Sequence, residues 1–170
     1  IWYDVFYVKK DVSPPSILDN QLGDDTWRKE PKPDGYNVDF EDYGGSLLNN
    51  AQYKVVRYLQ DGTTQYLTDW IDIFTNLNQK TYTDDWNIDF SLLPEGLSTI
   101  WVQVFDNAGN PQNIQTYPDP FYVKKDTTAP VCINNQFGDT TWRTTNNGFY
   151  DVDFYDATSG SGVKEIQVRI

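Results

Sequence analysis

Five residues, Tyr36-Asn37-Val38-Asp39-Phe40, bear on both the fold and the organisation of this chain. Aromatic and aliphatic side chains alternate with Asn and Asp, which is the period-two pattern of a strand with one buried face. The pattern returns 114 residues later as Tyr150-Asp151-Val152-Asp153-Phe154. The alternation predicts β-structure, and its return indicates that the chain repeats itself.

The repeat extends well beyond this strand. Residues 6–11 (Phe-Tyr-Val-Lys-Lys-Asp) recur unchanged as residues 121–126, and 14 of the 23 positions from 6 to 28 match their partners 115 residues later. A unit of this length can bury a core of its own. We therefore divide the chain into three parts: residues 1–11 are the last strand of a preceding repeat, residues 12–126 are a complete repeat, and residues 127–170 are the first strands of the next repeat. A partner chain could pair with the open strand edges of residues 127–170 by strand addition.

The rest of the complete repeat also reads as strands. Residues 86–90 and 100–104 alternate with period two, and residues 53–59 are β-branched and aromatic. Asp61-Gly62 predicts a hairpin with a type I′ turn. No segment has a helical period. Short strands separated by turns over about 115 residues predict an all-β fold, a β-sandwich.

Composition excludes several functions. The chain has 21 Asp and 4 Glu, a net charge of −12 and no His. Without His there is no Ser-His-Asp triad and no imidazole zinc site. The acidic charge disfavours nucleic acid, and no apolar run reaches the roughly 18–20 residues of a membrane helix. We expect no enzymatic activity, no nucleic-acid partner and no membrane insertion of this segment.

Three stretches carry a resemblance to a known family. They are residues 126–130 (Asp-Thr-Thr-Ala-Pro), residues 156–163 (Asp-Ala-Thr-Ser-Gly-Ser-Gly-Val) and residues 94–110, which end in Asp-Asn-Ala-Gly-Asn. Together they resemble bacterial immunoglobulin-like tandem repeat domains of large secreted or cell-surface proteins. The resemblance implies an immunoglobulin-like β-sandwich that serves as a spacer, stalk or adhesive module without catalytic residues. Residues 11–15 and 42–48 depart from the usual motifs.

Acidic residues are predicted to gather at one pole of the sandwich, because the linker and two loops meet there. Carboxylates and Asn carbonyls are ligands that calcium prefers, so a calcium site at the repeat junction is one interpretation. The other is that these residues simply cap turns. The candidates at the first junction are Asp11, Glu41, Asp42, Asp106 and Asn107, with Asn110 beside them, and those at the next junction are Asp126 and Asp156.

The strand at residues 100–105 predicts an outward aromatic surface. If Ile100, Val102 and Val104 form the core, Trp101 and Phe105 point outward, and Trp70 belongs to the same candidate surface. The loop at residues 70–80 can cover these side chains, another copy of the chain can pack on them, or sugar rings can stack on them. All three interpretations are open from the sequence.

The single cysteine, Cys132, aligns with Ile17 of the preceding unit. This alignment predicts a small buried hydrophobic residue, with an intermolecular disulfide as the alternative.

We expect a non-enzymatic structural repeat module, located outside the cell or on its surface, in a stalk, fibre, adhesin or surface layer. Its expected partners are the neighbouring repeats and other copies of the chain, with self-association into filaments and contact with glycans as further options. The alternative is a carbohydrate-binding β-sandwich module or an accessory domain of a secreted hydrolase.

Overall fold

The structure, a computed structural model, describes residues 6–21, 25–113, 121–138, 140–145 and 148–169. These residues form strands and one short 3-10 helix, with no α-helix among them, which confirms the predicted all-β class. The elements in chain order are β1 Ser16–Asp19, β2 Trp27–Arg28, β3 Val38–Glu41, β4 Leu48–Tyr58, β5 Thr64–Tyr66, β6 Ile71–Phe74, β7 Thr81–Tyr82, η1 Phe90–Leu92, β8 Gly96–Asp106, β9 Pro111–Asn113, β10 Phe121–Lys125, β11 Val131–Asn134 and β12 Val152–Tyr155.

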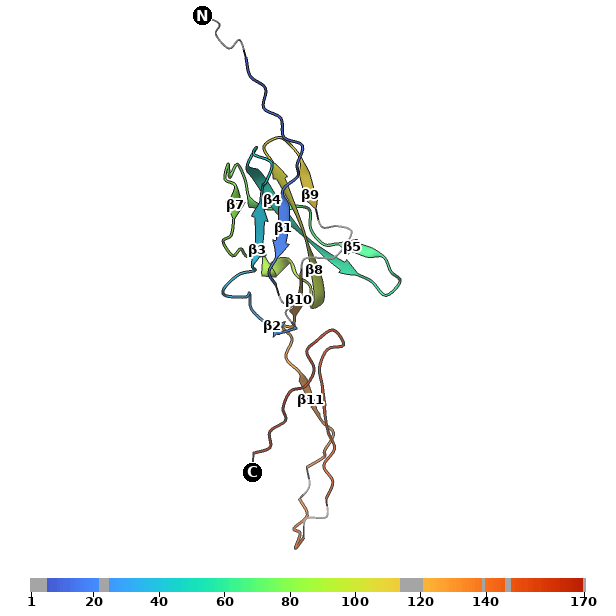
Figure 1. Ribbon diagram of the computed structural model, residues 1–170. Coiled ribbons are helices and arrows are strands. Elements are labelled where there is room, and N and C mark those ends of the chain that lie inside the picture. Colours follow the sequence, from blue (N-terminus) through green and yellow to red (C-terminus); the bar gives the residue numbers. More distant parts are fainter. Residues whose placement is uncertain (1–5, 22–24, 114–120, 139, 146–147, 170) are drawn as a thin grey trace, which may run out of the picture.

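The strands before β11 form two sheets around one core (Figure 1). The smaller sheet has the order β1-β3-β7, and the larger has the order β2-β10-β8-β4-β5, with β6 also paired to β4 and β9 to β8. Side chains from both sheets meet in the core; for example, Tyr36, just before β3, stacks on Phe121 of β10 with ring centroids 4.5 Å apart. This arrangement is consistent with a β-sandwich.

The predicted alternation matches the burial of two strands. Val38 and Phe40 of β3 are fully buried, whereas Asp39 and Glu41 between and after them are partly exposed. Ile100, Val102 and Val104 of β8 are fully buried as well. In β4, Tyr53 and Val55 point into the core.

The prediction of a strand at residues 86–90 is wrong, although the alternate residues are buried as the pattern predicted. Trp86, Ile88 and Phe90 are all buried, but only Trp86 pairs with another strand segment, through a bridge to Tyr36. The chain then turns into η1, because the Asp89 carboxylate accepts the Ser91 N–H at 2.9 Å and caps the helix. Local Asp and Ser hydrogen bonds compete here with a sheet ladder.

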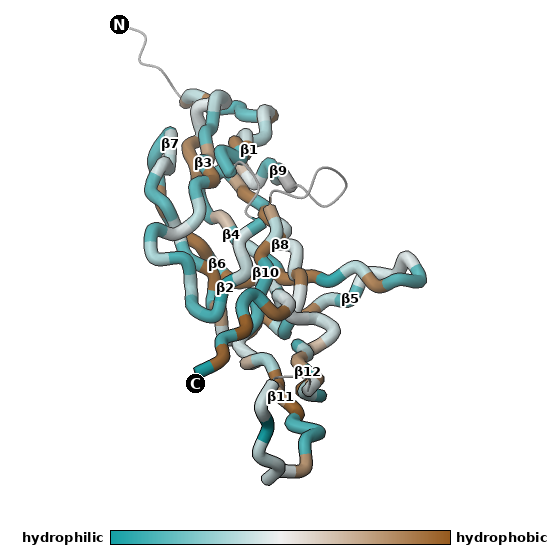
Figure 2. Tube along the Cα trace, turned by 90° about the horizontal axis from the view of Figure 1, so that it is seen from below, coloured by the Kyte–Doolittle hydropathy of each residue, from teal (hydrophilic) through white to brown (hydrophobic). Residues whose placement is uncertain are grey.

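The hairpin at Asp61-Gly62 forms, but its turn is not type I′. Gly62 has φ +83°, whereas Asp61 is not among the described residues with positive φ, so only one residue is left-handed. The Gly62 N–H donates to Leu59 O, and the Leu59 N–H donates to Thr63 O, which gives a longer loop than a two-residue turn. The hairpin of β4 and β5 projects from the body of the molecule (Figures 1 and 2).

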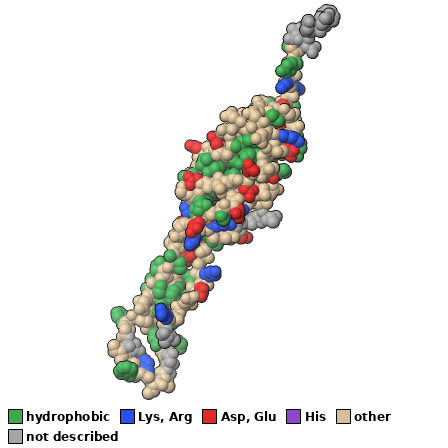
Figure 3. All heavy atoms as spheres, turned by 90° about the vertical axis from the view of Figure 1, so that its left-hand side faces the viewer, with side chains coloured by type: hydrophobic (Ala, Val, Ile, Leu, Met, Phe, Trp, Pro, Cys, Tyr) green, Lys and Arg blue, Asp and Glu red, His purple; other side chains and the backbone are tan. Residues whose placement is uncertain are grey.

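Residues 127–170, which the sequence predicts to begin the next repeat and which we call the second unit, contain an antiparallel pair, β11 and β12. No second sheet covers this pair among the described residues, and hydrophobic side chains are visible along this narrower part of the molecule (Figure 3). Cys132 of β11 is therefore exposed and makes no disulfide, whereas the equivalent Ile17 of β1 packs against the core. The prediction that Cys132 is buried is wrong in this structure.

Candidate functional site

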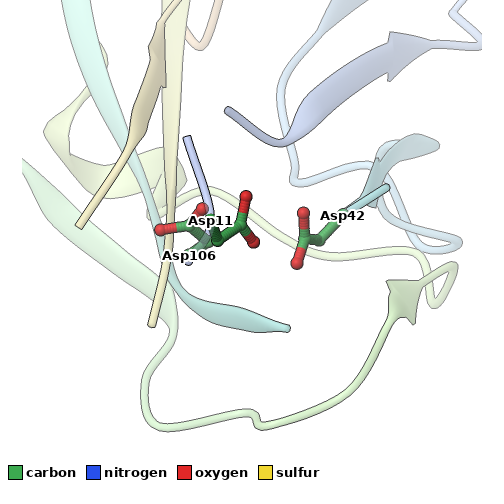
Figure 4. A group of neighbouring side chains, drawn as sticks. All are labelled: Asp11, Asp42 and Asp106. Atoms are coloured by element: carbon green, nitrogen blue, oxygen red, sulfur yellow. The ribbon is translucent and has the colours of Figure 1, made fainter. Parts of the chain in front are cut away.

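Three of the predicted acidic residues meet at one pole of the first unit, which is the complete repeat at residues 12–126 together with the linker that enters it. Asp11 lies in the linker before β1, Asp42 follows β3, and Asp106 ends β8. One carboxylate oxygen from each lies within 4.8 Å of the other two, and Figure 4 shows the three side chains gathered between the segments that carry them. Asp42 and Asp106 are 1% exposed, and Asp11 is half-buried. We call these three residues the carboxylate cluster.

The loop after β3 wraps around the Asp42 carboxylate. Its oxygens accept the backbone N–H groups of Gly44 at 2.7 Å, Gly45 at 3.3 Å and Leu47 at 2.6 Å. Charged acceptors of backbone N–H groups make stronger hydrogen bonds than neutral ones. Asp42 therefore sets the shape of this loop.

The other two carboxylates are held in the same way. Asp106 accepts the Asn110 N–H and the Asn110 side-chain amide, both at 2.7 Å, across the turn between β8 and β9. Asp11 accepts the N–H groups of Ser13 at 3.0 Å and Ser46 at 2.8 Å. These donors, first the Ser13 N–H, hold the pKa of Asp11 below its usual value. Repulsion among the three charges is thus opposed by fixed N–H donors.

Two predicted members lie outside the carboxylate cluster. The Glu41 carboxylate pairs with Lys80 Nζ at 3.1 Å, and the Tyr43 hydroxyl and Lys80 lower its pKa. The Asn107 side-chain amide donates to Ser46 O at 2.9 Å and to Asn78 Oδ1 at 3.0 Å, so it ties two loops together beside the cluster.

The hydrogen bonds that Asp11 and Asp42 accept at the entrance to the first unit, which we call the corner, recur in the second unit. Asp126 accepts the Ser161 N–H at 2.7 Å and the Thr128 N–H at 3.1 Å. The equivalent donors to Asp11, which lie 115 positions earlier in the sequence, are Ser46 and Ser13. Asp156 accepts the Gly162 N–H at 2.7 Å, as Asp42 accepts that of Leu47. The Ser161 hydroxyl and N–H lower the pKa of Asp126, as donors lower that of Asp11.

Two residues that the sequence did not single out, Gly44 and Leu47, have an unusual backbone environment at this corner. A Cβ atom on Gly44 would collide with the Asp11 carboxylate, so only glycine permits this close approach. Leu47 has φ +71°, a left-handed conformation that is costly for leucine; the equivalent Gly162 has φ +85°. The donation of the Leu47 N–H to Asp42 is therefore made from a strained backbone.

The aromatic surface predicted on β8 is largely closed. Trp101 is 7% exposed, its Nε1 donates to the Tyr58 hydroxyl at 3.2 Å, and the Tyr66 ring meets it edge-on at 5.8 Å. Tyr58 and Tyr66 of the β4–β5 hairpin thus cover Trp101. Trp70 is half-buried with Lys54 Nζ 4.9 Å from its ring centre, and Phe105 is half-buried farther along β8.

Comparisons with known proteins add no family to this picture. No protein-family model matches the chain, and the search of curated proteins finds no match. Among the described residues, no helix has the length and apolar character needed to cross a bilayer.

Proposed function

We propose that this chain is a non-enzymatic structural repeat module with an immunoglobulin-like β-sandwich, strung in tandem with like units in a large extracellular protein. The observation that supports this most is the repeated corner. Asp11 with Ser46, and Asp126 with Ser161, make the same hydrogen bond where the chain passes into each unit. The same arrangement of Asp and Ser at the start of both units supports a structural role in joining them.

Contacts at the end of β10 and in the linker that follows it support a fixed rather than a loose connection. The Lys125 ammonium donates to Phe90 O at 3.2 Å and to Leu93 O at 2.8 Å. The Thr127 N–H donates to the Glu95 carboxylate at 2.9 Å, and the Thr127 hydroxyl donates to the same carboxylate. The end of β10 and the start of the linker are therefore bound by residues 90–95, which precede β8 in the first unit, and such a connection suits a rod.

Antibody labelling tests the proposed location and role. Antibodies raised against the 170-residue chain should label intact, unpermeabilised cells or the material they shed. Removal of the gene should shorten or thin the surface layer or appendage seen by electron microscopy and should leave metabolism unchanged. Labelling that requires permeabilisation would contradict the proposal.

Calcium is the cation that the carboxylate cluster fits best. The donors are hard oxygens from three aspartates, with no His or Cys among them, and calcium takes six to eight oxygens at about 2.3–2.6 Å. Apart from Asp42 Oδ2, which accepts two N–H groups, each carboxylate oxygen that accepts an N–H retains a second lone pair. Asp11, Asp42 and Asp106 would hold the ion, which would neutralise their mutual repulsion and tie the linker to both loops.

Calcium should therefore raise the melting temperature. At a concentration 100 times its dissociation constant, a ligand of the folded state adds about 2.7 kcal/mol, which is roughly 5–10 °C for a chain of this size. Differential scanning calorimetry in calcium and in EDTA measures this difference. Asp11→Asn should abolish most of it, whereas Asp61→Asn, in the distant hairpin, should preserve it. Identical melts in calcium and EDTA would remove calcium from the proposal and leave the structural role to the labelling experiment.

A further inference from the structure

A cleft lies where the first unit meets the second, away from the carboxylate cluster. It is a shallow, open depression of about 440 Å³ between the ends of β2, β4 and β8 on one side and residues 158–160 on the other. Its size is within the range of small-molecule sites, which occur preferentially at domain interfaces. The backbone at Gly96 lies so near the second unit that an added Cβ would be 3.5 Å from the Ser159 Cβ. The cleft thus needs both units.

Aromatic and aliphatic side chains form its apolar walls. Trp27 of β2 is half-buried, and Tyr58 at the end of β4 and Leu97 at the start of β8 are 46% and 43% exposed. The Tyr58 ring is fixed at its hydroxyl, which accepts the Trp101 Nε1–H at 3.2 Å. Ordered rings that remain partly open to solvent offer apolar faces at little cost in side-chain entropy.

Polar groups lie beside these walls. The Arg57 guanidinium donates from Nε to Leu97 O at 3.3 Å and from Nη2 to Glu95 O, so two backbone carbonyls hold it in place. No carboxylate lies within 4 Å of it among the described residues, and the remaining N–H groups of its five are available to a ligand. Gln60, in the exposed β4–β5 turn, adds an amide that can donate and accept.

We propose that this cleft binds a saccharide. A pyranose ring has an apolar face of C–H groups, which packs on an aromatic ring, and a rim of hydroxyls, which pair with guanidinium and amide groups. Trp27 and Tyr58 supply the first kind of contact, and Arg57 and Gln60 the second. The acidic chain, with Glu95 at the cleft, disfavours phosphorylated ligands. A tandem array would carry one such cleft at each junction that has these residues.

The second unit provides a matched control. Trp142 occupies the same repeat position as Trp27, but it is 99% exposed and is not among the residues that line this cleft. A loss of binding on Trp27→Ala that Trp142→Ala does not share therefore reports on the cleft and not on a general property of the Thr-Trp-Arg segment.

Affinity electrophoresis of the whole chain tests the proposal. Native gels are cast with laminarin, galactomannan, arabinoxylan or polygalacturonate, and migration is compared with a gel that contains no polysaccharide. At least one polysaccharide should retard the chain. Trp27→Ala should raise the apparent dissociation constant about tenfold, and Gln60→Ala should raise it severalfold, while Trp142→Ala should leave it unchanged.

Three outcomes would overturn the proposal. They are no retardation by any of the four polysaccharides, unchanged retardation of Trp27→Ala and Gln60→Ala, and equal losses in Trp27→Ala and Trp142→Ala. Far-UV circular dichroism establishes that each variant is folded. If Trp27→Ala is unfolded, Gln60→Ala decides alone, because Gln60 is exposed in a turn and its removal leaves the core intact. The labelling experiment is independent of these results, so the structural role and the saccharide site can fail separately.

Discussion

Trp86→Ala should lower the free energy of unfolding by about 4 kcal/mol, the largest single effect that we expect. Trp86 is 5% exposed and lies between the two sheets. Its ring stacks on Tyr53 at 5.7 Å and meets Phe121 at 5.9 Å, and its Nε1 donates to Val38 O at 3.2 Å. Alanine would leave a cavity in the core and an unpaired buried carbonyl.

Two further variants separate these contributions. Trp86→Phe should cost about 1–2 kcal/mol, because it keeps a ring in the core and removes the hydrogen bond and part of the volume. Trp70→Ala, which removes a half-buried ring that faces Lys54, should cost much less than Trp86→Ala. Urea unfolding followed by far-UV circular dichroism gives all three values. A loss below about 1 kcal/mol for Trp86→Ala would mean that the ring is not a core contact.

Asp42→Ala should lower the free energy of unfolding by about 2–3 kcal/mol in the presence of EDTA. Three backbone N–H groups, those of Gly44, Gly45 and Leu47, would lose their acceptor. The loss is smaller than the sum of three charged hydrogen bonds, because the loop is exposed enough for water to replace part of it and because repulsion with Asp11 and Asp106 is relieved.

The neighbouring acid, Glu41, provides the control for Asp42→Ala. Its carboxylate pairs with Lys80 at the surface, so Glu41→Ala should leave the urea midpoint close to that of the unmodified chain. Asp42→Asn should fall between the two, since the amide oxygen can still accept an N–H. Equal midpoints for Asp42→Ala and Glu41→Ala would show that the loop does not depend on the buried carboxylate.

The sequence predicted the buried side of a strand correctly where hydrophobic and polar residues alternate along it. Alternation in β3 and β8 identified their buried faces, and the order of strands and loops brought Asp11, Asp42 and Asp106 to one pole. The sequence could not show that Glu41 faces away from this group, because its partner Lys80 lies 39 residues further along the chain.

The remaining differences arise from contacts that a local pattern does not contain. Asp89 and Ser91 turn the chain into η1, which ends the alternation that predicted a strand. Cys132 is exposed because no second sheet covers β11 among the described residues, although alignment with Ile17 predicted burial. The cleft beside Trp27 combines residues from distant segments, so no single motif in the sequence indicated it.

The position of β10 determines how the module would respond to tension. The linker to the next unit continues directly from β10, which is paired with β8 in antiparallel fashion over Phe121–Lys125 and with β2 in parallel. The linker into the unit enters at the opposite pole (Figure 1). A pull along the array therefore runs along β10, and its hydrogen bonds to β8 are loaded in shear. In the structural role that we propose, these hydrogen bonds would have to break together rather than one after another, and the module would resist extension along its own axis.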